Sequence, residues 1–155
     1  ALAKLSIRAE RDADPSVRRI AVGALSFATD ASVLPALGLA LGDSDWQVRQ
    51  EAAVTLGKLL LPESVSILVG ALDDPAWEVR LKAANALGKL KATSALPGLI
   101  GALAHPISNL RKEAAGALGA IGDPAAIPAL QKAATEDRDI DVNKTARRAL
   151  ESIQP

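Results

Sequence analysis

The stretch WQVRQEAAVTLG at residues 46–57 recurs as WEVRLKAANALG at 77–88 and as SNLRKEAAGALG at 108–119, each copy 31 residues after the last. An earlier copy, PSVRRIAVGALS, occupies residues 15–26, and a weaker copy, IDVNKTARRALE, occupies 140–151, one residue late. A fixed period of this length is typical of stacked supersecondary units, each of which buries its apolar face only against its neighbours. The repeat, rather than any single residue, therefore decides the fold.

Each period contains two patterns of apolar residues at helical spacing. The first, which we call the A helix, follows a Leu-Pro or Ile-Pro pair such as Leu34-Pro35. Pro is tolerated there because its missing N–H has no partner in a first helical turn. After an acidic turn, the Val-Arg stretch predicts a second helix, the B helix, whose Val, Ala and Leu side chains form one apolar stripe. The B helices are predicted at 15–27, 45–59, 76–89, 107–120 and 139–153.

The chain is thus predicted to be an all-α solenoid of five helix-turn-helix repeats, forming a single domain over residues 1–155. A core of Ala, Leu, Val and Ile is expected, because the chain has two Trp, one Phe and no Tyr. Arg147 and Arg148 place charge on the last helix, as a terminal cap requires. The first helix carries apolar residues that could pack against another repeat, which allows end-to-end stacking. The expected repeats are 1–29, 30–60, 61–91, 92–122 and 123–155.

The composition argues against several classes of protein. The 18 Lys and Arg residues balance the 18 Asp and Glu residues, and a neutral chain is a poor match for nucleic acid or anionic lipid. The absence of Cys excludes disulfides and thiolate chemistry. No apolar run approaches the ~18 residues of a membrane span. We expect a cytoplasmic monomer that uses no cofactor and binds neither nucleic acid nor membranes, with end-to-end stacking as the alternative to the monomer.

The Leu-Pro helix, the acidic turn and the Val-Arg-x-x-Ala-Ala-x-Ala-Leu-Gly pattern together resemble the HEAT-like repeats first grouped with the phycobilisome bilin lyases. Designed consensus repeats derived from them are equally similar, so the pattern fits a natural domain and an engineered repeat protein alike. The resemblance spans essentially the whole chain and implies a right-handed α-solenoid of HEAT-like repeats, with the B helices lining a concave surface. It also implies an Arg–Asp ladder between adjacent repeats, built on Arg18, Arg49, Arg80 and Arg111, with Asp12, Asp43, Asp74 and the exception His105 six positions before them.

The residues predicted to bind a partner lie at positions of the B helices that face the concave surface. Trp46 and Trp77 occupy the same slot in consecutive repeats, and Trp is enriched at interface hot spots. Leu81 lies one helical turn from Trp77 and is expected to extend an apolar patch. The alternative is that each Trp covers the seam between two repeats. The predicted polar rim consists of Gln47, Gln50, Glu51, Glu78, Lys82, Asn85, Asn109 and Lys112.

Glu51, Lys82 and Glu113 alternate in sign along the stack, so part of this rim is also expected to pair between repeats. No catalytic residue and no metal site is predicted. His105, the only His, stands beside a Pro and is expected to be an exposed loop residue. The acidic residues at 136–141 lack the Gly and terminal Glu of a calcium loop, so they are interpreted as helix caps.

The leading hypothesis is a non-enzymatic scaffold that binds a protein or peptide on the concave face of the B helices. The alternative, implied by the resemblance, is a bilin lyase or chaperone-type subunit that handles an open-chain tetrapyrrole, with Arg19, Lys82 or Lys112 meeting its propionates. HEAT-like di-iron hydroxylases need repeated His-Glu pairs, and HEAT-like DNA glycosylases need a cationic groove. A single His and the near-alternation of charges argue against both.

Overall fold

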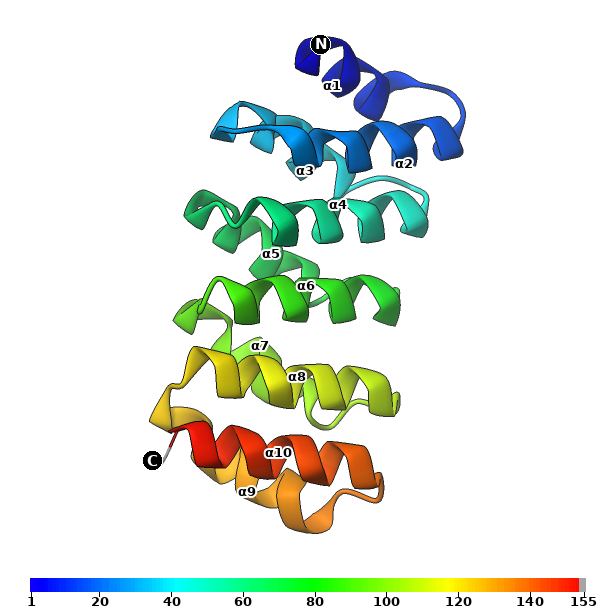
Figure 1. Ribbon diagram of the computed structural model, residues 1–155. Helices are drawn as coiled ribbons and strands as arrows, with labels where there is room; N and C mark the ends of the chain where they lie inside the picture. Colours follow the sequence, from blue (N-terminus) through cyan, green and yellow to red (C-terminus); the bar gives the residue numbers. More distant parts are fainter. Residues whose placement is uncertain (154–155) are drawn as a thin grey trace.

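The computed structural model describes residues 1–153, which form a right-handed α-solenoid of stacked helix pairs without any β-strand in that range (Figure 1). The all-α solenoid predicted from the sequence is confirmed. The A helices are α1 (Leu2–Arg11), α3 (Leu34–Ala40), α5 (Val65–Ala71), α7 (Leu96–Ala102) and α9 (Ile127–Glu136). The B helices are α2 (Pro15–Ala24), α4 (Trp46–Leu59), α6 (Trp77–Lys89), α8 (Ser108–Ile121) and α10 (Ile140–Ile153).

The ends of the helices follow from local chemistry. Asp45 caps α4, since its carboxylate accepts the N–H of Gln47 at 2.8 Å. At its other end α4 ends at Leu59, because the next residue, Leu60, adopts a left-handed conformation with φ of 52°. The first B helix is shorter than the predicted 15–27, because after Ala24 the chain tightens into a 3₁₀ turn that ends at Phe27. A 3₁₀ turn also precedes each of α3, α5, α7 and α9.

The core is a spine of small and branched aliphatic side chains. Val48, Ala52 and Leu56 of α4 are fully buried, and the same slots of α6 and α8 are filled in the same way. Consecutive B helices pack directly against one another from α2 to α10, whereas the A helices beyond α3 share few contacts with each other (Figure 1). Because the more closely packed layer lies on the inside of a curve, the B helices line the inner side of the superhelix.

The glycines that close the Leu-Gly pairs of the B helices α4, α6 and α8 allow this close approach. A Cβ added to Gly119 of α8 would lie 2.8 Å from the Cα and 2.7 Å from the Cβ of Ala149 in α10. A Cβ on Gly88 of α6 would meet Ala117 of α8 at similar distances. The backbone of one B helix therefore rests on the next at a separation that a side chain on the glycine would prevent.

Candidate functional site

A ladder of arginine–aspartate pairs joins the repeats along the edge where the A helices turn into the B helices. Nε and Nη2 of Arg18 donate to the two carboxylate oxygens of Asp43 at 2.7 and 2.8 Å. Arg49 binds Asp74 in the same way at 2.8 and 3.0 Å. The bidentate geometry uses the full fork of the guanidinium, which makes these pairs stronger than a single ionic hydrogen bond.

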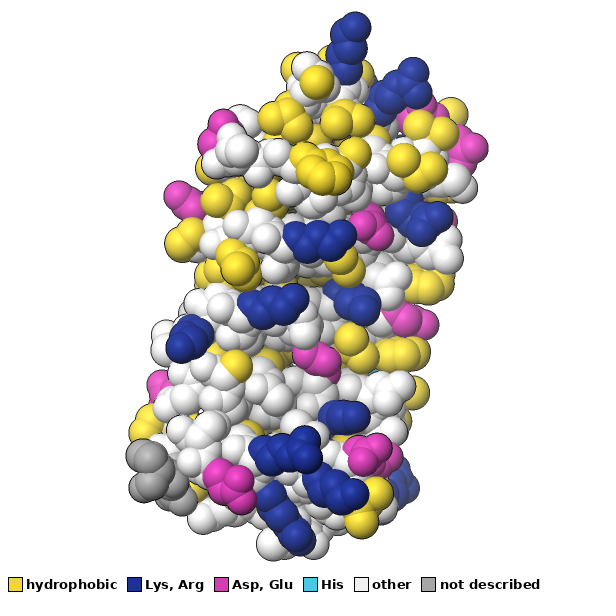
Figure 2. Space-filling model, in the orientation of Figure 1, with side chains coloured by type: hydrophobic (Ala, Val, Ile, Leu, Met, Phe, Trp, Pro, Cys, Tyr) yellow, Lys and Arg dark blue, Asp and Glu magenta, His cyan; other side chains and the backbone are white. Residues whose placement is uncertain are grey.

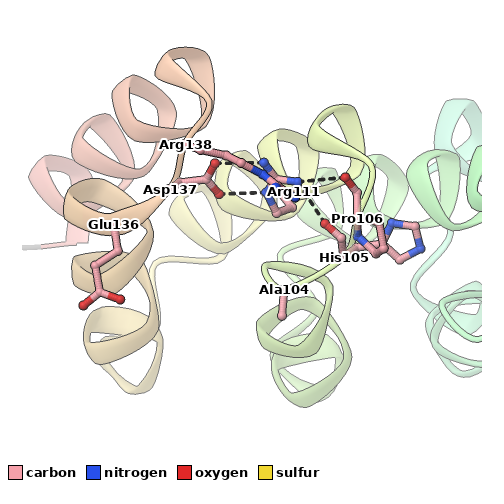
Figure 3. A pocket seen from close by; sticks show the side chains of 7 residues that line it. All are labelled: Ala104, His105, Pro106, Arg111, Glu136, Asp137 and Arg138. Atoms are coloured by element: carbon pink, nitrogen blue, oxygen red, sulfur yellow. Dashed lines mark hydrogen bonds and ion pairs between the residues drawn. The ribbon is translucent and has the colours of Figure 1, made fainter.

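The third pair joins Arg111 to Asp137 at 2.7 and 2.8 Å, and both side chains are almost completely buried. Figure 3 shows Arg111 between this carboxylate and the backbone carbonyls of His105 and Pro106. The guanidinium thus ties its own repeat to the next one. The ladder expected from the resemblance is present at this junction, and its role is structural.

The residue six positions before each ladder arginine is not its ion-pair partner. That residue gives its own Arg only a backbone carbonyl, as Asp12 does to Nη1 of Arg18 at 2.9 Å. The carboxylate comes from the following repeat, 25 or 26 residues later. In the last repeat, where Asn143 replaces Arg, its amide still donates to the carbonyl of Asp137 at 2.9 Å. The carbonyl contact therefore persists where the ion pair is lost.

The carboxylates of the ladder are held in their charged form. The Arg18 hydrogen bonds lower the pKa of Asp43 below its ordinary value, against the opposing effect of burial. The Arg111 hydrogen bonds lower the pKa of Asp137 in the same way. For Asp74, burial acts most strongly and raises the pKa, but the hydrogen bonds from Arg49 and the backbone outweigh it, so the pKa is lowered overall.

The ladder is interrupted at one junction, between Arg80 and His105. His105 stands where the other junctions have Asp, and its Nδ1 accepts the N–H of Ile107 at 3.1 Å, as Asp43 accepts the N–H of Asp45. His105 lies in the loop between α7 and α8, as expected, but the expectation that it is exposed is wrong, because it is half-buried. Burial, and then the charges of Arg80 and Arg111, lower the pKa of the imidazole.

The predicted apolar anchors of the B helices differ in exposure. Trp46 is 39% exposed and lines a surface cavity of 420 Å³ together with Arg49 and Glu78. Trp77 and Leu81 are half-buried. Of the two Trp residues, Trp46 is therefore the more open and lies beside a concavity, whereas the lower exposure of Trp77 is closer to the alternative that a Trp covers a seam.

The predicted rim residues divide into an outer and an inner set. Gln47, Asn109 and Lys112 are exposed. The inner set is half-buried, and Asn85 of α6 donates to the carboxylate of Glu113 in α8 at 2.8 Å. This contact joins adjacent repeats through an amide, whereas the ion pairs within residues 1–153 are the three of the ladder and do not include the expected pairing of Glu51, Lys82 and Glu113. The half-buried rim residues are Gln50, Glu51, Glu78, Lys82 and Asn85.

Exposed apolar side chains gather toward the N-terminal repeats (Figure 2). Ile20 on α2 is 67% exposed and Phe27 just after it is 85% exposed. Ile7 of α1 and Leu39 of α3 are also exposed, at 56% and 62%. Phe27 was not among the residues predicted from the sequence to bind a partner, although a single Phe in a chain poor in aromatic residues could have indicated it.

Exposed charges on the B helices are mostly positive, although the chain as a whole is neutral. Figure 2 shows Lys and Arg following one another down the B-helix face toward the C-terminal end. The exposed acidic residues of these helices within the described range are Asp141 and Glu151. Among the fully exposed side chains of these helices, basic residues therefore outnumber acidic ones, while Glu51, Glu78 and Glu113 are half-buried. The exposed basic residues are Arg19, Lys58, Lys89, Lys112, Lys144, Arg147 and Arg148.

Within residues 1–153, no three acidic, His or Cys side chains converge as metal ligands would. None of the helices in this range combines the length and the apolar character that crossing a membrane requires.

Comparisons with known proteins agree with this architecture. The family model for HEAT repeats matches residues 2–80 and 68–151. No curated protein sequence matches the chain. A chain in the complex of CpcE and CpcF of phycocyanin lyase from Nostoc sp. PCC7120 has a TM-score of 0.85 and 30% identity, over 97% of this chain and 64% of that one. This protein thus spans less than two thirds of the length of that lyase chain.

Engineered repeat proteins are similar as well. One engineered protein has a TM-score of 0.76 and 27% identity, covering 99% of this chain and 81% of that one. A designed armadillo repeat protein in complex with the peptide (KR)4 has a TM-score of 0.75 and 25% identity, covering 99% of this chain and 82% of that one. Natural and designed solenoids therefore share this arrangement of helices.

Proposed function

Since the chain belongs to the HEAT repeat family, we propose that it is a non-enzymatic interaction module that binds a protein or peptide along its B-helix face. The observation that carries this proposal is a gradient along that face: exposed apolar side chains are concentrated toward the N-terminal repeats, with Ile140 as an exception, and exposed Lys and Arg toward the C-terminal end. We call these ends the apolar part and the basic part. A stack of helices offers such a face as a continuous, rigid surface without any catalytic group.

The apolar part supplies anchoring contacts. Ile20 and Trp46 lie on consecutive B helices, and Trp46 borders the 420 Å³ cavity that also contains Glu78. An aromatic ring beside a concavity is the arrangement found at interface hot spots, where a partner side chain fills the pocket and excludes water.

The basic part selects the charge of the partner. Four basic side chains are exposed on α8 and α10, against the two exposed acidic side chains Asp141 and Glu151; the basic residues are Lys112, Lys144, Arg147 and Arg148. Such a surface attracts acidic segments and speeds their association. The designed armadillo relative is in complex with the basic peptide (KR)4. That likeness supports a peptide as the class of partner. Because the exposed charges of this face are mostly positive, we expect the peptide to be acidic and to carry an apolar anchor.

Fluorescence anisotropy with two labelled peptides tests this proposal. One peptide carries alternating Asp and Glu with a Leu anchor, and the other replaces the acids with Lys and Arg. We expect the acidic peptide alone to bind, with affinity that falls as salt is added. Trp46→Ala and Lys112→Gln should weaken binding, while Lys132→Gln on the A helix α9 is the matched control. Equal binding of both peptides, or equal loss in the control, would contradict the proposal.

A second candidate is a subunit that handles an open-chain tetrapyrrole. The likeness to a chain of the phycocyanin lyase complex favours this candidate, because the two chains share 30% identity and superpose with a TM-score of 0.85. Arg19, Lys82 and Lys112 of the B-helix face are the residues that would meet propionate groups. Adding a bilin and recording its visible absorption separates the candidates: a saturable shift that Lys112→Gln reduces supports this function, and an unchanged spectrum removes it.

A further inference from the structure

The interrupted junction of the ladder leaves a guanidinium with open donors. Nε of Arg80 turns back to donate to the carbonyl of Asp74, whereas the other ladder arginines use Nη1 for that carbonyl. Within residues 1–153, Arg80 forms no ion pair and its Nη atoms have no hydrogen-bond partner. It is the only ladder arginine of the described chain without a carboxylate.

A cavity of 250 Å³ lies next to this guanidinium, between the end of α5, the start of α6 and the helix α7. Arg80 and His105 both line it, so one side is polar and basic. The opposite side is formed by α7, where Gly101 faces open space and Gly98 lies close to Leu72. The remaining lining residues are Asp73, Pro97, Ala102 and Leu110.

His105 adds a second donor to this cavity. Because Nδ1 accepts the N–H of Ile107, the proton of the neutral ring is assigned to Nε2. Figure 3 shows that the ring points away from the Arg111–Asp137 pair and toward the preceding repeat. The lowered pKa of His105, caused by burial and then by Arg80 and Arg111, keeps the ring neutral at pH 7, with this N–H available.

We propose that this cavity is a carboxylate-binding site, in which a carboxylate from outside the chain takes the place that Asp fills at the other junctions. There, one carboxylate satisfies two guanidinium donors of the preceding repeat. Here Arg80 offers its two Nη groups instead, because its Nε donates to the carbonyl of Asp74, and His105 replaces the built-in acid. The site lies on the edge of the A–B turns rather than on the B-helix face, so it is independent of the proposed partner surface.

The surrounding charges favour a monoanion. Asp74 and Arg111 are already paired, with Arg49 and Asp137 respectively, so neither competes for the ligand. Asp73 lines the cavity and is exposed. Its carboxylate repels a dianion such as phosphate about twice as strongly as it repels a carboxylate. The ligand is therefore a carboxylate of a partner side chain or of a small free acid.

NMR of the imidazole tests the site, because His105 is the only His in the chain. Sodium acetate is titrated against sodium chloride at constant ionic strength. We expect a saturable shift of the ring signals and an increase in the pKa of His105, since a nearby anion favours the protonated ring. In Arg80→Gln the apparent affinity should fall roughly tenfold or more. An equal response to chloride, an equal response in Arg80→Gln, or tighter binding of inorganic phosphate would overturn the proposal.

A second variant keeps the test decisive if Arg80→Gln folds poorly. His105→Asp rebuilds the acid of the other junctions, so we expect a more stable protein whose Ile107 amide signal no longer responds to acetate. A persistent acetate response in His105→Asp would refute the site. The amide-blocked amino acid N-acetyl-aspartate amide identifies the source of the carboxylate: tighter binding than acetate assigns the site to a partner's acidic side chain, and equal binding assigns it to a free acid.

Discussion

Replacing Gly119 by Ala should push two B helices apart. A Cβ at this position would lie 2.8 Å from the Cα of Ala149 and 2.7 Å from its Cβ. These atoms belong to the backbone and first side-chain carbon of α10, which cannot rotate away. An ordinary contact of about 3.5 Å would require α8 and α10 to separate locally by roughly 0.7 Å.

The size of the effect follows from two opposing contributions. Overpacking of a close-packed site costs about 1–3 kcal/mol. Ala is favoured over Gly within a helix by about 0.5–1 kcal/mol. The net result for Gly119→Ala is a loss of roughly 0.5–2 kcal/mol in the free energy of unfolding. Gly116, three residues earlier in the same helix, provides the control, because its added Cβ would meet only Thr145 Cγ2, at 3.8 Å.

Urea unfolding followed by far-ultraviolet circular dichroism measures both variants. We expect Gly116→Ala to unfold at a higher urea concentration than the parent and Gly119→Ala at a lower one, with an unchanged slope. Since the gain in helix propensity is common to both variants, their difference isolates the contact with Ala149. If Gly119→Ala were as stable as Gly116→Ala, the close approach of the B helices would not be what the glycine provides.

Three further predictions concern the ladder and the caps. Arg111→Gln should lower the free energy of unfolding by roughly 1.5–3 kcal/mol in urea titrations, because the buried Asp137 loses its charged donors. The pKa values of Asp43 and Asp137 are lowered in the folded state, so their stabilisation is present above about pH 4 and lost as the pH falls further. Acid titration should show this loss, and Asp137→Asn should flatten it. Ala76→Asp should raise the thermal midpoint, with a gain of about 0.5–1 kcal/mol, because Ala76 has the extended N-cap geometry of Asp45 without its side-chain acceptor.

The repeat predicted the fold because each period carries the same constraints. Val48, Ala52 and Leu56 fall on one stripe by spacing alone, and the structure buries all three completely. The partner in the ladder was harder to predict. Asp43 precedes Arg49 by six residues but pairs with Arg18, 25 residues before it, because stacking brings the turn of one repeat beside the helix of the previous one. Sequence distance gives no measure of that proximity.

The exposure and charge of the B-helix face could be predicted only in part from the sequence. Exposure depends on how neighbouring side chains cover one another, so Trp46 and Trp77 share a slot and yet differ in exposure. Similarly, Glu113 accepts a hydrogen bond from Asn85 of the preceding repeat and is half-buried, whereas its neighbour Lys112 is exposed. The sign of the face thus arises from contacts between repeats that one-dimensional alternation does not contain.

The separate interfaces of a solenoid explain how one junction can differ without loss of the fold. In a solenoid, stability is approximately a sum over repeats and their nearest-neighbour interfaces, so a missing ion pair weakens one interface and leaves the others intact. Between α6 and α8 the aliphatic packing of Val79, Ala83 and Leu87 remains complete. The Arg80–His105 junction therefore gives up one charged contact while its helices stay in register. A ligand that supplies the missing carboxylate would strengthen this interface alone, stiffening the stack at its centre.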